Sequence, residues 1–439
     1  MEIQGRVIHS VDVLVIGAGQ AGICAAYELQ KRGFTGFAGS LGADDGVTKR
    51  RKKPALGTFV VLDAEEAPGG AWQHRWPTLT MATINHIADL PGQPVEELDL
   101  NAPARLFVPA YFAEFEHEND LPILRPVRVH EVRNVYPEAG GEGSEALNRE
   151  ASWNNSQDSA AGDTSAAHGS SGTGGGALSL RPTPDSHHSE LGELLEARTS
   201  AGIWRAKFII NCTGTWQRPF VPYVRGAENF RGEQYHTQNY PGPARFWKQR
   251  VLVVGGGISA IGHVEELSKE AKKVRWVTRT PPRWRKYVSS DSEGLKPEYG
   301  RDVEERVRAR VAAGFPPLPV VAETGLPLTK HIRELRENGV LKRKPMFDRL
   351  DADGAWWGKK HENFDAIIWA TGFRHNLGHL RPLKLRSPNG GIQMDGVHTM
   401  FNPRVYLIGY GPSASTVGAR RDARVVAREI RQQFSSLLT

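Results

Sequence analysis

Short apolar runs that lead directly into glycines are the first pattern along this chain. Residues 11–16 form such a run, Gly17 follows it, and apolar residues recur at helical spacing over 23–29. A strand buried on both faces is apolar at nearly every position, whereas apolar residues three and four apart are typical of a helix. The segment 11–33 is therefore predicted to form a strand, a tight turn and a helix.

The same pattern returns further along the chain. Strands are predicted near 58–62, 127–135, 194–198, 208–212, 250–254, 366–369 and 405–408, with those at 208–212 and 250–254 buried. Helices are predicted over 258–270 and from about 415 to 434, and residues 346–357 predict a hairpin that turns at Asp353 and Gly354. Apolar strands alternating with helices indicate an α/β architecture with parallel sheets.

Two segments depart from this pattern. Residues 35–57 are rich in glycine and basic side chains and are predicted to be a surface insertion. Residues 138–190 are rich in Gly, Ser, Ala, Asp and His and poor in apolar side chains. Such a composition buries too little apolar surface to offset the entropy of ordering it, so we expect a disordered loop there.

Composition narrows the class of protein. The length of 439 residues suggests two or three domains, and 56 basic against 49 acidic residues give a net charge of +7. The basic clusters at 49–53 and 342–344 are not interleaved with aromatic residues, which argues against nucleic-acid binding. No apolar run approaches the ~20 residues of a membrane helix, and the beginning of the sequence lacks the apolar core of a signal peptide. A cytoplasmic protein without a membrane anchor is the expectation.

Two cysteines are too few for a disulfide scaffold or a zinc site with paired CxxC motifs. Cys24 falls in the first predicted helix and Cys212 at the end of a predicted buried strand, so both are interpreted as core residues. His187 and His188 have no further metal-ligating residues near them in sequence. We therefore expect no metal site.

The glycines after the first strand predict a dinucleotide site. The turn consists of Gly17, Ala18, Gly19, Gln20, Ala21 and Gly22. In such a motif the first glycine permits the tight turn, the second lets a pyrophosphate approach the backbone, and the third lets helix and strand pack closely. Asp63 ends the next predicted strand and is expected to accept a hydrogen bond from a ribose hydroxyl. Its distance from the glycines exceeds the usual ~20 residues because the 35–57 insertion intervenes.

A second motif of this kind begins at Gly255. It continues through Gly256, Gly257, Ile258, Ser259 and Ala260, again between a predicted strand and a helix. The following strand ends at Arg279 rather than at an acid. A cation at that position favours a 2′-phosphate and hence NADPH over NADH, unless Arg279 is only a solvated surface residue. Two dinucleotide sites in one chain indicate flavin plus nicotinamide.

Several motifs, in order, resemble those of the flavin-containing and Baeyer–Villiger monooxygenase superfamily. They are GG-x-W at 69–72, CTG at 212–214, FxGxxxHxxxY at 230–240, RTPPRW at 279–284, ATGF at 370–373, and the C-terminal flavin segment at 406–416. The resemblance implies two Rossmann-like domains. A discontinuous FAD-binding domain would comprise 1–219 and 376–439, with an NADPH-binding domain inserted at 220–375.

The resemblance also implies a reaction. NADPH would give a hydride to FAD, and O₂ would then be activated as a C4a-peroxyflavin that oxygenates a small organic substrate. Tyr240 is typical of the N- and S-oxygenating branch, whereas Pro241 is typical of the Baeyer–Villiger branch, so the type of oxygenation stays open. The implied partners are a small-molecule substrate and O₂, and the oligomeric state stays open.

The resemblance assigns candidate residues. His236 and Tyr240 would lie on the linker between the nucleotide domains, with His236 interpreted as a hinge-positioning residue, and Asn85 is a candidate flavin neighbour. Trp72 and Trp76 would either line the flavin pocket or pack in the core. The cofactor-binding candidates are Gly17, Ala18, Gly19, Gln20, Ala21, Gly22, Asp63, Gly70, Trp72, Thr213, Gly214, Gly255, Gly257, Ser259, Ala260, Arg279, Thr280, Thr371, Gly372, Gly409, Ala414 and Ser415.

Three rival functions follow from the same layout. A pyridine-nucleotide disulfide reductase would need a CxxC beside the flavin, and the sequence has none. An NADPH-dependent flavin reductase without oxygenation is one remaining alternative. A flavin-bound regulatory or binding protein is the other.

Overall fold

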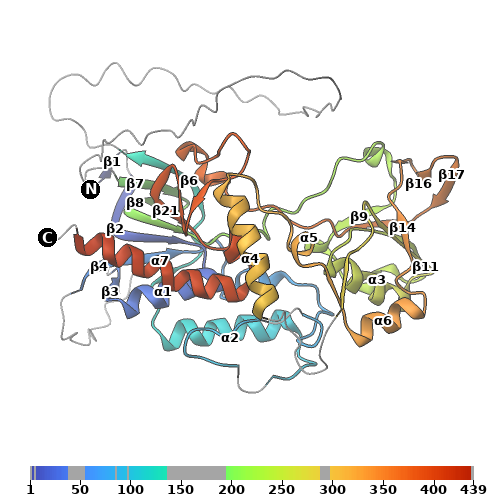
Figure 1. Ribbon diagram of the computed structural model, residues 1–439, viewed down its shortest axis with the longest axis horizontal. Helices are drawn as coiled ribbons and strands as arrows, with labels where there is room; N and C mark the ends of the chain where they lie inside the picture. The colour runs from blue at the N-terminus through green and yellow to red at the C-terminus, as the bar shows by residue number, and fades with distance from the viewer. Residues whose placement is uncertain are drawn as a thin grey trace, which may run out of the picture. The chain divides into compact units, whose positions relative to one another are not determined.

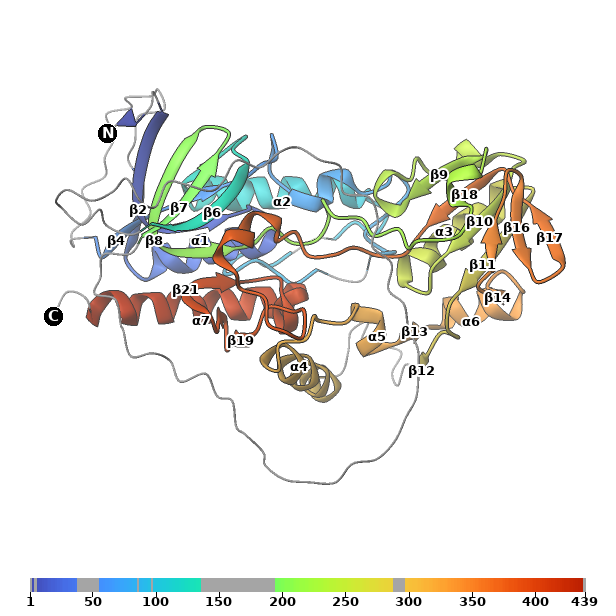
Figure 2. The ribbon, with the colours of Figure 1, turned by 90° about the horizontal axis from the view of Figure 1, so that it is seen from above.

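The computed structural model describes residues 2–3, 6–37, 55–84, 87–95, 98–135, 194–286 and 297–436. The predicted disordered loop at 138–190 and most of the basic insertion lie outside the described residues, as does Asn85. Residues 1–134 and 194–439 belong to one unit of the structure, which holds two central sheets. Figures 1 and 2 show the course of the chain through these elements.

The first sheet has β2 at its centre. Its main path runs β19-β20-β21-β8-β2-β4-β3, and β2 is parallel to both β4 and β8. In this register Val15 lies between Val61 and Ile210, and all three are fully buried. The strands are β1 (Glu2–Ile3), β2 (Arg6–Ile16), β3 (Phe34–Gly36), β4 (Gly57–Leu62), β5 (Ile123–Leu124), β6 (Val129–Val135), β7 (Leu194–Thr199), β8 (Gly202–Asn211), β19 (Met394–Asp395), β20 (His398–Thr399) and β21 (Asn402–Leu407).

Three helices accompany this sheet: α1 (Gln20–Lys31), α2 (Ala104–Glu118) and α7 (Thr416–Ser436). Figure 1 shows them together on one side of β2 and β4. Ile23 of α1, Phe112 of α2 and Ile430 of α7 join the same apolar core as the strand residues Val13 and Val15. Burial of these side chains is the main stabilising contribution, at about 25 cal/mol per Å² of apolar surface removed from water.

The second sheet is entirely parallel, in the order β14-β11-β10-β18-β9. Helix α3 (Ile258–Glu270) packs against β10 and β11, and α6 (Lys330–Glu337) lies near β13. A hairpin, β15–β16, continues into β17. The strands of this sheet are β9 (Glu233–His236), β10 (Arg250–Val254), β11 (Lys273–Thr278), β14 (Arg343–Pro345) and β18 (Ala366–Trp369). Two small separate sheets are formed by β12 (Trp284–Lys286) with β13 (Leu326–Leu328), and by β15 (Arg349–Leu350), β16 (Gly354–Trp357) and β17 (Lys360–Asn363).

Helix α4 (Pro297–Ala312) lies beside the elements of the first sheet. It packs against β19 and against the 3-10 helix η6 (Gly411–Ala414). Val311 belongs to the core cluster that includes Leu407 and Tyr410, and Arg421 of α7 forms an ion pair with Glu304. The short helix α5 (Val320–Thr324) follows. Residues predicted to lie within the NADPH-binding range thus pack on the first sheet's side, and the predicted domain boundaries stay predictions.

The predicted α/β class with parallel sheets is confirmed. Several elements differ in extent from their predictions; β8, for example, begins at Gly202 rather than at Phe208. The first strand begins at Arg6 rather than Val11, because its early residues pair with β8. Thr35 and Gly36, counted in the basic insertion, form β3 because they pair with β4. Among the described residues, none of the helices is long and apolar enough to cross a membrane.

Candidate cofactor-binding and active site

The first glycine turn is built by close backbone contacts. Gly17 has φ +96°, and its N–H donates to Leu62 O at 2.8 Å. A Cβ on Gly22 would lie 1.8 Å from Gly17 O, so only glycine allows α1 to begin this close to the strand. At Gly19 a Cβ would meet nothing within 4 Å, which leaves open space at the start of α1. Ala18 is buried, and Gln20 donates to Ala88 O.

The predicted ribose-binding acid lies in a buried ion-pair network. Asp63 follows β4, and its Oδ2 accepts from Arg125 Nε at 2.9 Å. Arg125 also forms a two-pronged pair with Glu116 of α2, at 2.7 and 2.8 Å. Burial raises the pKa of Glu116, and the two carboxylates keep the pKa of Arg125 above its usual value. Arg125 thereby fixes the orientation of Asp63, a role that the sequence analysis missed.

Gly70 lets the GG-x-W segment pack against the first glycine turn. Gly70 has φ +50°, and a Cβ on it would lie 3.0 Å from Gly19 Cα. Gly70 begins the 3-10 helix η1 (Gly70–His74), which carries Trp72. The Arg75 guanidinium lies between the Trp72 ring, 5.0 Å away, and the Trp216 ring, 4.4 Å away. The aromatic segment is therefore held against the predicted pyrophosphate position.

The other first-sheet candidates lie where β8 and β21 end. Thr213 donates to Asn376 O at 2.6 Å, and Gly214, with φ +59°, accepts from Asn376 N at 3.0 Å. Gly409 has φ +89°, and Ala414 closes η6. Ser415 accepts from Gly418 N at 3.0 Å and so caps the start of α7. Thr213 therefore has a backbone partner of its own in addition to its predicted cofactor role.

The second glycine turn repeats the first with differences. Gly255 has φ +144°, and a Cβ there would lie 2.1 Å from Ala370 O. Gly257 precedes α3, Ser259 lies in its first turn, and Ala260 is fully buried. Neither α1 nor α3 has a side-chain cap or an acid in its first turn. Both helix starts therefore keep the positive end of the backbone dipole free for an anion.

Arg279 and Thr280 follow β11 on the exposed surface beside this turn. The preceding residue, Thr278, is buried and donates to Thr280 O at 2.7 Å, which holds the backbone at the end of the strand. Arg343 of β14 donates to Thr278 Oγ1 at 2.6 Å. Two guanidinium groups thus lie near the position predicted for a 2′-phosphate.

Two chain segments cross side by side between the sheets, at 213–220 and 371–376. Phe220 N donates to Gly372 O at 3.0 Å, Arg374 N donates to Arg218 O at 2.8 Å, and Thr371 donates to Phe220 O. His236, at the end of β9, donates from Nε2 to the same Gly372 O at 3.0 Å and accepts at Nδ1 from Gln238 N. This pattern requires a neutral ring, and burial lowers the pKa of His236.

Tyr240 lies in a buried aromatic cluster. One ring of the cluster, Trp76, comes from the segment after η1, and another, His263, comes from α3. The Tyr240 ring stacks on Phe246 and lies 4.2 Å from the His263 ring, which in turn is 4.9 Å from the Trp76 ring. Glu266 of α3 accepts from Trp76 Nε1 at 3.2 Å and from Thr78 Oγ1 at 2.8 Å. Burial lowers the pKa of His263 to about 3 and raises that of Tyr240.

The structure thus brings the predicted candidates into two groups, one at each glycine turn, with His236 and Tyr240 between the segments that connect them. Asn85 lies outside the described residues. Sequence reasoning missed Arg75, Arg125, His263 and Glu266. For Arg75 the sequence offers one signal, its position three residues after the tryptophan of the GG-x-W motif.

The two cysteines are buried and free. Burial raises the pKa of Cys24 to about 12 and raises that of Cys212. Neither thiol is poised to form the thiolate that disulfide exchange requires. Within the described residues there is also no group of three or more His, Cys, Asp or Glu that could hold a metal ion.

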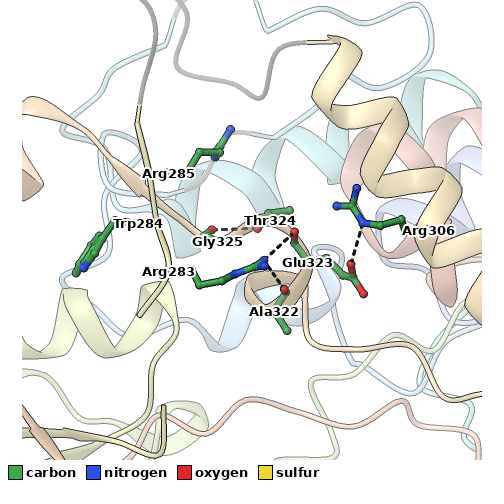
Figure 3. A pocket seen from close by; sticks show the side chains of 8 residues that line it. All are labelled: Arg283, Trp284, Arg285, Arg306, Ala322, Glu323, Thr324 and Gly325. Atoms are coloured by element: carbon green, nitrogen blue, oxygen red, sulfur yellow. Dashed lines mark hydrogen bonds and ion pairs between the residues drawn. The ribbon is translucent and has the colours of Figure 1, made fainter. Parts of the chain in front are cut away.

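A cavity of about 360 Å³ lies among β12, α4 and α5. Figure 3 shows Arg283 reaching Ala322 O and Glu323 O, Arg306 facing Glu323, and the Trp284 ring turned aside. It is lined by Arg283, Trp284, Arg285, Arg306, Ala322, Glu323, Thr324 and Gly325. Arg283 donates to the two backbone carbonyls, and Arg306 forms an ion pair with the Glu323 carboxylate. None of the predicted site residues lines this cavity.

Comparisons with known proteins agree with this geometry. The family model described as pyridine nucleotide-disulphide oxidoreductase matches residues 189–324. A flavin-containing monooxygenase from Stenotrophomonas maltophilia superposes with a TM-score of 0.66 and 28% identity, over 97% of this chain and 99% of that chain.

Two curated relatives match over shorter stretches. An uncharacterized CzcO-like oxidoreductase of Geobacillus kaustophilus is 22% identical over 60% of this chain and 53% of its own length. Cyclopentanone 1,2-monooxygenase of a Comamonas species is 33% identical over 25% of this chain and 21% of its own. The chain thus spans about half the length, or less, of these relatives.

The fold and both glycine turns define a flavoprotein with two dinucleotide-binding modules. The chain is similar in fold and sequence to flavin-containing and Baeyer–Villiger monooxygenases. Its named relatives are oxidoreductases.

Proposed function

We propose that this protein is an FAD- and NADPH-dependent monooxygenase acting on a small organic substrate. The observation that carries the proposal is the pair of strand–glycine turn–helix units, each with an uncapped helix start, joined by the crossing segments that His236 braces. Both curated relatives extend beyond the matched region, so their substrates are not transferred to this chain.

The residues present fit FAD at the first turn. The open space at Gly19 would receive the pyrophosphate, and the start of α1 would offer backbone N–H groups to it. Asp63, held by Arg125, would accept a ribose hydroxyl. The start of α7, capped by Ser415, would face the flavin ring with the positive end of its dipole.

NADPH fits the second turn in the same way. The start of α3 would hold its pyrophosphate, and Arg279 would bind the 2′-phosphate. When bound, the two cofactors would supply hydride transfer and oxygen activation. Within the chain, His236 would hold the crossing segments in register, and the rings of Trp76 and Tyr240 would exclude water from the junction. Neutral His236 donates from Nε2 and has no proton to release at Nδ1.

The test begins with the purified protein. Extraction should release FAD, and NADPH should be consumed faster than NADH. Thioethers, amines and ketones are then supplied in turn, and oxygenated product is compared with hydrogen peroxide. Arg279→Met should raise the KM for NADPH roughly tenfold or more, the loss expected for a charged hydrogen bond, and leave the KM for NADH unchanged.

Each outcome separates the alternatives. Oxygenated product supports the monooxygenase. NADPH oxidation that yields only hydrogen peroxide or a reduced acceptor with every substrate supports the flavin reductase. Bound FAD without NADPH oxidation supports a regulatory or binding protein. A protein that cannot be reconstituted with FAD contradicts all three.

A further inference from the structure

Arg75 stands out among the arginines near the first turn because its guanidinium is stacked between two indole rings. Its Cζ atom lies 5.0 Å from the Trp72 ring centre and 4.4 Å from that of Trp216. Trp216 in turn stacks on Phe373, with ring centres 4.9 Å apart. Stacking of this kind holds an arginine rigidly and leaves the edge of its guanidinium available for hydrogen bonds.

The charge of Arg75 has no counter-ion among the described residues. No carboxylate or carbonyl in that part of the chain accepts from its side chain, and its Nε is shut off from solvent without an acceptor. Burial lowers the pKa of Arg75 to about 10. Arg125, in contrast, pairs with both Asp63 and Glu116. Arg75 is partly buried. A cation whose Nε is buried without an acceptor is costly, and an anion bound beside it would offset that cost.

The sheet order places this cation at the first glycine turn. Trp72 follows the end of β4 and Trp216 follows the end of β8, and β2 lies between these two strands. The turn that begins at Gly17 continues directly from β2. The contact of Gly70 with Gly19 holds the Arg75 segment against that turn. In parallel α/β sheets, ligands bind beyond the carboxyl ends of the strands.

We infer that Arg75 is a binding residue for a phosphate group of a dinucleotide held at this edge of the sheet. The inference rests on the proposed function and adds a residue to it. The forked guanidinium, oriented by the two indoles, would donate to phosphate oxygens, and the diphosphate would supply the missing counter-charge. The diphosphate belongs either to FAD or to NADPH, and binding measurements distinguish the two.

The experiment compares three variants with the wild type. Arg75→Met removes the charge at similar length, and Arg75→Lys keeps the charge without the fork. Arg349→Met is the matched control, because Arg349 also stacks on an indole, 4.3 Å from Trp356, on the hairpin β15–β16. FAD affinity of the apoprotein is measured by flavin fluorescence, and NADP⁺ affinity of the FAD-loaded protein by calorimetry.

Arg75→Met should weaken binding of one dinucleotide tenfold or more, and Arg75→Lys at least threefold, whereas Arg349→Met should change neither. Weaker FAD binding assigns the phosphate to FAD. Weaker NADP⁺ binding with unchanged FAD binding assigns it to NADPH.

Unchanged affinities in the Met variant would show that Arg75 only packs between the indoles, and would overturn the inference even if the melting temperature falls. Should Arg75→Met not fold, unchanged affinities in Arg75→Lys would overturn it equally. A wild-type protein that binds neither dinucleotide contradicts the proposed function itself, so the two failures are distinguishable.

Discussion

The two strand–turn–helix units share a backbone plan but differ in how closely the helix approaches the turn. In the first, the sixth position of the motif is Gly22, where a Cβ would lie 1.8 Å from Gly17 O. In the second, the sixth position is Ala260, whose side chain is fully buried. The second helix therefore starts with room for a methyl group that the first excludes.

The units differ equally in their buried charges. Beside the first, Asp63, Arg125 and Glu116 compensate one another in a single network. In the second, α3 buries His263 as a neutral ring, and Arg279 remains on the surface. Beside the first turn the buried groups are thus ion-paired carboxylates and a guanidinium, whereas the helix of the second turn buries a neutral imidazole. Single substitutions should therefore affect the two units very differently.

The largest effect is expected from Arg125→Met. Removing this cation would leave Asp63 and Glu116 buried without a partner, which costs about 3–5 kcal/mol. Urea unfolding of the variant should report this loss. Arg279→Met, at the surface of the second unit, is the control and should change the free energy of unfolding by about 0.5 kcal/mol or less. Equal effects of the two substitutions would contradict the contrast between the units.

The next effect concerns the sixth motif position. Gly22→Ala would force the start of α1 away from the strand and should cost about 3 kcal/mol, with a loss of FAD affinity. The reciprocal change, Ala260→Gly, only loosens a helix turn and should cost about 1 kcal/mol. Thermal unfolding and flavin titration measure both. A Gly22→Ala variant with wild-type stability would show that the first turn is as roomy as the second.

A third prediction uses pH. His263 faces Thr237, Tyr240 and Trp76, and the nearby His236 also disfavours its protonation. Its pKa is lowered from 6.5 to about 3, so the unfolded chain takes up a proton before the folded chain does. The free energy of unfolding is therefore highest above pH 6.5, where His263 is neutral in both states. Below pH 6.5 it falls by about 1.4 kcal/mol per pH unit until the pH approaches 3.

His263→Phe removes this linkage. Between pH 7 and pH 5 the variant should therefore lose about 2 kcal/mol less stability than the wild type, as measured by urea unfolding at each pH. His117→Phe serves as the control, because His117 is exposed on α2. Parallel pH profiles for the wild type and His263→Phe would mean that His263 is not held neutral by burial.

Sequence reasoning succeeded where the signal is local. The apolar run at 11–16 and the glycines after it predict the β2–α1 turn, and the run at 250–254 predicts β10–α3, because strand burial and positive φ act over a few neighbouring residues. The side-chain partners could not be predicted in this way. Asp63 and Arg125 are 62 residues apart, and Trp76 and Glu266 are 190 apart. No periodicity connects such pairs, since the sheet order alone brings them together.

The smallest effect tests the direct link between the two units. Trp76 follows the segment anchored on the first turn, and its Nε1 donates to Glu266 in the helix that begins at the second turn. Ser259, His263 and Glu266 are spaced to share one face of α3, so this bond restrains the face that carries Ser259. In a double-mutant cycle with Trp76→Phe and Glu266→Ala, we expect a coupling of about 1 kcal/mol in stability.

Each of the two substitutions, Trp76→Phe and Glu266→Ala, should lower kcat more than it raises the KM for NADPH. The reason is that the hydrogen bond positions the second unit without touching the nucleotide. Glu266→Gln keeps an acceptor oxygen for Trp76 and should restore most of kcat. Thr78→Val removes the second donor to Glu266 and serves as the matched control, since the indole bond stays intact. If the two substitutions prove additive in both stability and kcat, the Trp76–Glu266 bond does not hold the units in register, and the crossing segments braced by His236 must do so alone.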